Sequence, residues 1–211
     1  MENKIIKQNE EVKGIKGVVT VKAFKAGTID KMMPYVTQLK IYLQLARENP
    51  KLRDFLIRQS EDVRAKIKEI FDAAQIGEPI IQNNIVVSSP NVGKDVIIQR
   101  LASINTYSLN ILWGEIGTGN TTPGVGDVAL TAPTNRAPIS FSEDFGATTA
   151  IVQFYIPDAA LANSTYYEIG TFIDGSSTIG SGQMFNHALL TVPYVKVAGT
   201  DTTIEVDYIV T

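Results

Sequence analysis

The composition of the chain changes abruptly near residue 78, and this change constrains the fold more than any other feature. Residues 1–78 contain 15 Lys and Arg against 11 Asp and Glu, a net charge of +4; residues 79–211 contain 4 against 11, a net charge of −7, and the two sum to −3. The second part also holds 12 of the 16 glycines, which favours strands and turns. We therefore expect two domains, residues 1–78 and residues 79–211.

The first part has the pattern of one strand followed by two helices. Residues 17–24 alternate apolar and polar side chains, which predicts a short strand. Apolar residues then recur at intervals of three and four from Thr28 to about Glu48, and again from Pro50 to about Gly77. We expect residues 1–78 to be a mainly helical anchoring or oligomerisation region.

The second of these helices carries one apolar stripe. Leu56, Val63 and Ile70 are seven residues apart, and Ile67 lies between the last two. Such spacing is typical of a short coiled-coil seam in an oligomer, but a helix that packs on its own domain produces the same stripe. Both alternatives stay open, and these four residues are the candidate oligomer interface.

The second part has the pattern of a β-rich domain. A short helix is expected near residues 90–101, because Pro90 can open it and apolar residues follow. The strands expected on either side of it cover residues 80–88, 107–116, 139–143, 150–156, 166–173, 184–192 and 202–210. The predicted fold is α+β, with an N-terminal helical region followed by a C-terminal antiparallel β-sandwich, jelly-roll-like.

Few residues offer catalytic or metal-binding chemistry. The chain has no Cys, and its single histidine, His187, lies in a predicted strand, where we expect a structural or surface role. The glycines of residues 114–126 lack the Lys of a phosphate-binding loop. The loop carboxylates have no EF-hand spacing and are expected to be solvated; they are Asp127, Glu143, Asp144, Asp158 and Asp174. We predict a non-enzymatic protein without catalytic residues, metal or cofactor.

Charge and hydropathy exclude two classes of partner. A sequence pI of about 5.3 argues against a nucleic-acid binder. Apolar runs such as residues 151–156 are far shorter than a membrane span, and residues 1–11 lack the apolar core of a secretory signal. We expect a soluble protein without an export signal or membrane insertion.

Aromatic residues give the only candidate ligand-binding positions. Tyr166 and Tyr167 are adjacent in a predicted strand, so their side chains point to opposite faces, and one of them is a candidate contact for a glycan or receptor. A glycan-cleaving site would need two facing carboxylates, such as Glu143 with Asp144 or Asp174. Neighbouring residues of a strand point apart, which disfavours Glu143 with Asp144.

The order of several short segments resembles virion proteins of tailed bacteriophages over about residues 83–211. Each segment alone is common, but their order and spacing are more specific. The chain departs from the pattern at Thr171, where the family has a larger apolar residue, and its N-terminal helical region has no identified counterpart. The segments are Asn84-Ile85-Val86, Gly93-Lys94, Arg100-Leu101-Ala102, Ile116-Gly117-Thr118-Gly119-Asn120-Thr121-Thr122-Pro123, Asp127-Val128-Ala129-Leu130, Arg136, Tyr167-Glu168-Ile169-Gly170-Thr171-Phe172, Met184-Phe185-Asn186-His187 and Lys196.

The resemblance implies a non-enzymatic β-sandwich in a fibre, spike, tail or capsid-surface protein. Its partners would be other virion proteins and further copies of the chain, in a homo-oligomer. Its location would be the virion, after synthesis in the host cytoplasm. The opposite charges of the two parts of the chain also favour head-to-tail contacts between subunits. The alternative is a module that recognises a glycan or receptor on the host surface.

Overall fold

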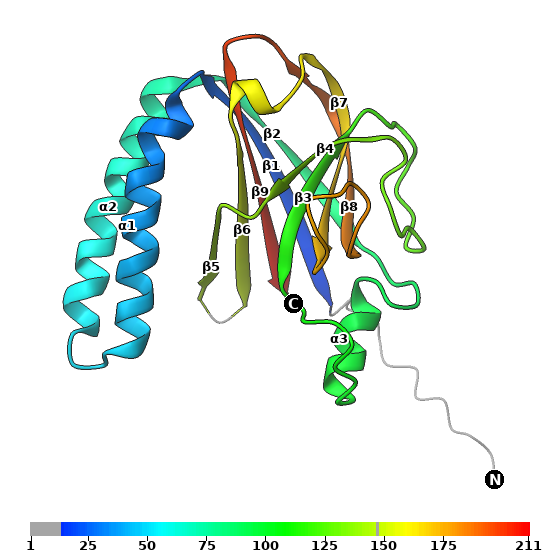
Figure 1. Ribbon diagram of the computed structural model, residues 1–211, viewed down its shortest axis with the longest axis horizontal. Coiled ribbons are helices and arrows are strands. Elements are labelled where there is room, and N and C mark those ends of the chain that lie inside the picture. The colour runs from blue at the N-terminus through cyan, green and yellow to red at the C-terminus, as the bar shows by residue number, and fades with distance from the viewer. Residues whose placement is uncertain (1–13, 147) are drawn as a thin grey trace.

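The protein is described by a computed structural model that covers residues 14–146 and 148–211 (Figure 1). Residues 1–11, where no secretory signal is expected, lie outside this range. Nine strands form one antiparallel sheet in the order β4-β3-β7-β8-β2-β1-β9-β6-β5. The strands are β1 (Ile15–Lys25), β2 (Gln75–Val86), β3 (Ile111–Gly117), β4 (Pro133–Pro138), β5 (Phe141–Phe145), β6 (Thr149–Ile156), β7 (Ser164–Ile173), β8 (Gln183–Lys196) and β9 (Thr200–Val210).

The helices are inserted between strands rather than placed ahead of them. α1 (Thr28–Glu48) and α2 (Arg53–Ala74) form a hairpin between β1 and β2, and these two strands pair with each other. α3 (Lys94–Leu101) and a 3-10 turn, η1 (Asp158–Ala160), lie further along the chain. The expected α+β order, an N-terminal helical region and then a β-sandwich, is therefore wrong.

This correction has a physical reason in the pairing of β1. The strand lies between β2 and β9, and its register with β9 runs from Ile15 opposite Val210 to Lys25 opposite Thr200. The N-terminal strand thus lies inside the sheet and joins its two halves, and the structure is mostly β. The boundary expected at residue 78 falls inside β2.

The sheet is curled, and a single core fills its concave side. β4 and β5 are the two end strands of the sheet, yet only Ile139 and Ser140 separate them in the chain. The Ile139 N–H donates to the carbonyl of Leu112 in β3, and the Ser140 N–H donates to the carbonyl of Gln153 in β6. The core draws on strands from both halves of the sheet, including Val19, Ile116, Phe154, Ile169 and Ile204.

The helical hairpin covers part of the convex side, next to β5 and β6 (Figure 1). Met32 is fully buried and belongs to an apolar cluster with Phe141 of β5 and Tyr155 of β6. The ring of Phe71 in α2 stacks on Phe24 of β1, with centroids 4.4 Å apart. No helix in the described ranges is long and apolar enough to cross a membrane.

Candidate functional site

The apolar stripe of α2 faces the inside of the molecule. Leu56 and Val63 are both 7% exposed. Val63, with Ile67 and Ile70 beside it, packs in the cluster between the hairpin and the sheet. Val63, Ile67 and Ile70 thus take part in the chain's own packing, and Leu56 is buried as well. That these four residues form an oligomer interface stays a prediction.

A cavity of about 600 Å³ separates the hairpin from the convex side of the sheet. Its floor is largely apolar, with Phe24, Phe71 and Phe141 among the lining residues. One wall is polar, because Gln153 donates to Glu205 and accepts from the hydroxyl of Tyr155. Burial raises the pKa of Tyr155, and the nearby Glu205 carboxylate adds to this shift.

The two candidate ligand-facing tyrosines have different environments. Tyr166 is 1% exposed, and its hydroxyl donates to the carbonyl of Ala162. Tyr167 is half-buried. The alternation of a strand thus separates the pair as expected, but the Tyr166 ring lies in the main core, where it cannot stack on a glycan.

His187 lies under the long connection between β3 and β4, between two carboxylates. Its Nδ1 is 2.7 Å from Asp127 and its Nε2 is 3.2 Å from Glu168. Glu168 is fully buried and accepts backbone hydrogen bonds from Gly119, Thr131 and Ala132. His187 itself is 2% exposed. This cluster fastens residues 118–132 onto the sheet, in agreement with the structural role that the sequence predicts for His187.

A second charged cluster fastens the connection between β7 and β8. Arg136 and Glu115 form an ion pair of 2.5 Å, and their side chains are 1% and 0% exposed. Arg136 also donates to the carbonyls of Ser176 and Ser181, while Glu115 accepts from the Gly180 N–H. The guanidinium lies over the rings of two aromatic residues, Trp113 and Phe172. Residues 114–126, with no phosphate-loop Lys, thus adjoin two buried ion clusters.

The remaining loop carboxylates serve as partners for other parts of the chain. Glu143 pairs with Arg64 of α2, and Asp144 pairs with Arg47 of α1. Asp174 accepts from the backbone and hydroxyl of Ser108. Across the ranges that the structure covers, no group of three or more His, Cys, Asp or Glu residues has a geometry able to hold a metal ion.

Several exposed apolar side chains lie at the α3 end of the molecule, and sequence reasoning missed them. Ile98 and Leu101 of α3 are 61% and 78% exposed, and Ile104 just beyond the helix is 51% exposed. Leu109, just before β3, and Leu112, near the start of β3, are also exposed. Figure 1 shows α3 projecting beyond the sheet. We call these five residues the α3 surface; its signal in the sequence is an apolar stripe at positions 98, 101 and 104.

An apolar opening lies next to the α3 surface. It has a volume of about 580 Å³ and leads toward the core of the curled sheet. Its lining includes Leu109 of the α3 surface, together with Ile97, Ile111, Phe185 and Tyr208. Exposed apolar side chains that gather in one region of a folded protein are typical of interaction sites.

Comparisons of the chain with protein-family models, with curated proteins and with solved structures return no match.

Proposed function

We propose that this protein is a structural component of a tailed-phage virion that acts through protein–protein assembly, and that its copies associate through the α3 surface. The observation that carries the proposal is the exposed apolar stripe of Ile98, Leu101 and Ile104. Removing these side chains from water stabilises an interface by about 25 cal/mol per Å² of apolar area. Covering the stripe with a partner therefore stabilises the assembly.

The residues that resemble virion proteins support this proposal by what they do in the fold. Asp127, Glu168 and His187 hold one connection against the sheet, and Arg136 holds another. Gly119 brings its N–H to 3.1 Å from Glu168, and a Cβ at this position would lie 2.5 Å from the same carboxylate. These motif residues hold the connections firmly against the sheet, and rigidity of this kind suits a component of a particle.

The test is solution mass by light scattering on the full chain, because deletion of residues 1–78 would remove the central strand β1. We expect an oligomer for the natural sequence and a monomer for the double variant Ile98→Asp/Leu101→Asp. The matched control is Ile81→Asp, since Ile81 is 65% exposed on β2, away from α3. A monomeric natural chain, or equal dissociation by the control variant, would refute assembly through the α3 surface.

A further inference from the structure

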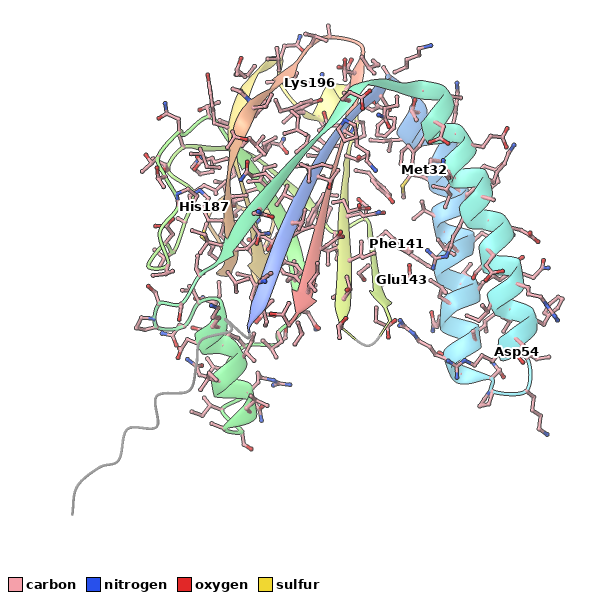
Figure 2. The ribbon with its side chains drawn as sticks, turned by 180° about the vertical axis from the view of Figure 1, so that it is seen from behind. Met32, Asp54, Phe141, Glu143, His187 and Lys196 are labelled. Carbon is pink, nitrogen blue, oxygen red and sulfur yellow. The ribbon has the colours of Figure 1, made fainter. Side chains whose placement is uncertain are left out.

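Lys196 is a fully buried cation that pairs with one carboxylate, Asp158. It is the last residue of β8, and its side chain is 0% exposed. Figure 2 places it at the end of the sheet where the β8–β9 connection turns. Lysine is among the residues least often fully buried, and its long side chain ordinarily carries the amine to solvent.

Three oxygen atoms surround the buried amine. Lys196 Nζ is 2.5 Å from Asp158 Oδ1, 2.9 Å from the carbonyl of Val197 and 3.3 Å from Asn163 Oδ1. Asn163 immediately precedes Ser164, the residue directly opposite Lys196 in the β7–β8 pairing. The fold therefore holds the primary amine of Lys196 within contact of both a carboxamide, Asn163, and a carboxylate, Asp158.

The carboxylate of Asp158 is held in place by several hydrogen bonds. Asp158 accepts backbone hydrogen bonds from Gly199 and Thr200 in addition to the one from Lys196. The hydrogen bond from Lys196, followed by that from Thr200, holds the pKa of Asp158 below its ordinary value. Aromatic residues lie near the group, because Tyr194 is two residues before Lys196 in β8 and its ring stacks on Tyr166.

We propose that Lys196 forms an isopeptide bond with Asn163, with Asp158 as the proton carrier. Asp158 takes a proton from Nζ, and the free amine attacks Cγ of Asn163. The Nζ–Cγ bond forms, Asp158 passes its proton to the amide nitrogen Nδ2, and the Cγ–Nδ2 bond breaks. As the carbonyl of the new amide re-forms, Asp158 takes the second proton from Nζ and passes it to the departing ammonia, which leaves as ammonium, and Asp158 returns to a carboxylate. No oxidant, metal or second molecule is needed.

The fold promotes the reaction by holding the amine of Lys196 and the carboxamide of Asn163 next to each other, without chemical activation of either group. An amine and a carboxamide react very slowly in water, but groups held in contact in one molecule reach effective concentrations of about 10⁵–10⁸ M. Lysine amines act as nucleophiles at protein sites that remove them from water. The product would join β7 to β8 at the end of the sheet opposite the α3 surface, which adds a covalent link to a shell built for rigidity.

Trypsin digestion of the denatured full chain followed by mass spectrometry gives a direct test. Between Arg136 and the C-terminus Lys196 is the only basic cleavage site. An unlinked chain therefore releases residues 197–211 as a separate peptide. A linked chain yields residues 137–211 as one species that is lighter by one ammonia, because trypsin does not cut after an acylated lysine. Release of residues 197–211 in full yield would overturn the proposal.

Variants separate the isopeptide bond from other losses of ammonia. Asn163 precedes a serine, so a succinimide at Asn163 would also lose ammonia, but it would leave Lys196 cleavable; that result counts against the proposal. Lys196→Arg keeps the positive charge and cannot form the bond, and Asp158→Asn removes the proton carrier. Both should restore full cleavage after residue 196, whereas the control Asn120→Ala, at an exposed turn, should not. Loss of water instead of ammonia would overturn the assignment to Asn163.

Discussion

The substitution Glu168→Gln tests whether the buried charge under residues 118–132 holds that connection in place. The carboxylate is fully buried, and its Oε1 accepts from Gly119 and Ala132 while its Oε2 accepts from Thr131 and faces His187. A glutamine has nearly the same shape but replaces one of these oxygens by an NH₂ group, which donates. The change therefore removes acceptors without opening a cavity.

The expected cost follows from the number of donors that lose an acceptor. If the NH₂ replaces Oε2, the N–H of Thr131 is left unpaired; if it replaces Oε1, those of Gly119 and Ala132 are. Each buried unpaired donor costs about 1–3 kcal/mol. The remaining bonds lose the extra strength that an ionised acceptor gives them. We expect the free energy of unfolding to fall by about 3 kcal/mol.

Equilibrium urea unfolding measures this loss, followed by the fluorescence of Trp113, the single tryptophan, which lies on the same side of the sheet. Hydrogen exchange at the amides of Thr131 and Ala132 should accelerate in the variant. Asp127→Asn is the matched control, because its side chain is 30% exposed, and it should cost only about 1 kcal/mol. A loss below about 1 kcal/mol for Glu168→Gln, or equal losses for the two variants, would refute the reasoning.

Two further predictions concern the convex side of the sheet. Burial and then the nearby Glu205 raise the pKa of Asp207 to about 6, so the folded state binds its proton more tightly than the unfolded state, and stability falls as pH rises from about 4 to about 6. Asp207→Asn should therefore raise the free energy of unfolding at pH 8 and change it little at pH 4 in urea titrations; equal effects at both would contradict the sign. Met32→Ala should cost about 2–4 kcal/mol, because Met32 is 0% exposed, and clearly more than Met33→Ala at the half-buried neighbour; similar losses of thermal stability would show that the hairpin is not firmly packed on the sheet.

Local patterns in the sequence predicted the helices well. The helix expected from Thr28 to about Glu48 is α1, and the one expected from Pro50 to about Gly77 is α2 (Arg53–Ala74). An apolar stripe with a period near 3.6 depends only on residues close in sequence, so it can be recognised without knowing what the helix packs against. The stripe could not say what that neighbour is, and this left the role of Leu56, Val63, Ile67 and Ile70 open.

Sheet order was beyond the reach of the same reasoning. The strand expected at residues 17–24 exists as β1, but its partner β9 begins 175 residues after β1 ends, as the pairing of Lys25 with Thr200 shows. No local pattern encodes such a contact. The composition break near residue 78 is real, yet it marks the return of the chain from the hairpin into the sheet. A change of composition along a chain can accompany a change in what the chain packs against, as well as a boundary between domains.

The basic and acidic parts of the chain form ion pairs with each other within one molecule. Arg47 and Arg64, on the basic hairpin, pair with Asp144 and Glu143 of β5 (Figure 2 labels Glu143 beside the helices). We expected such complementarity to act between subunits. The Arg47–Asp144 pair is largely exposed and worth at most about 1 kcal/mol. The apolar cluster around Met32, together with the less exposed Arg64–Glu143 pair, therefore holds the hairpin to the sheet.

The scarcity of basic residues after residue 78 has a structural explanation once the ion pairs are known. Only Lys94, Arg100, Arg136 and Lys196 occur there, and the last two are fully buried. A buried charge without a partner costs several kcal/mol. Arg136 is therefore paired with Glu115, and Lys196 is paired with Asp158. The two exposed cations that remain both lie in α3. The α3 surface therefore combines exposed apolar side chains with the basic charge that the rest of residues 79–211 lacks on its surface. Since residues 79–211 carry a net charge of −7, the α3 surface of one copy is best suited to contact an acidic part of the next copy.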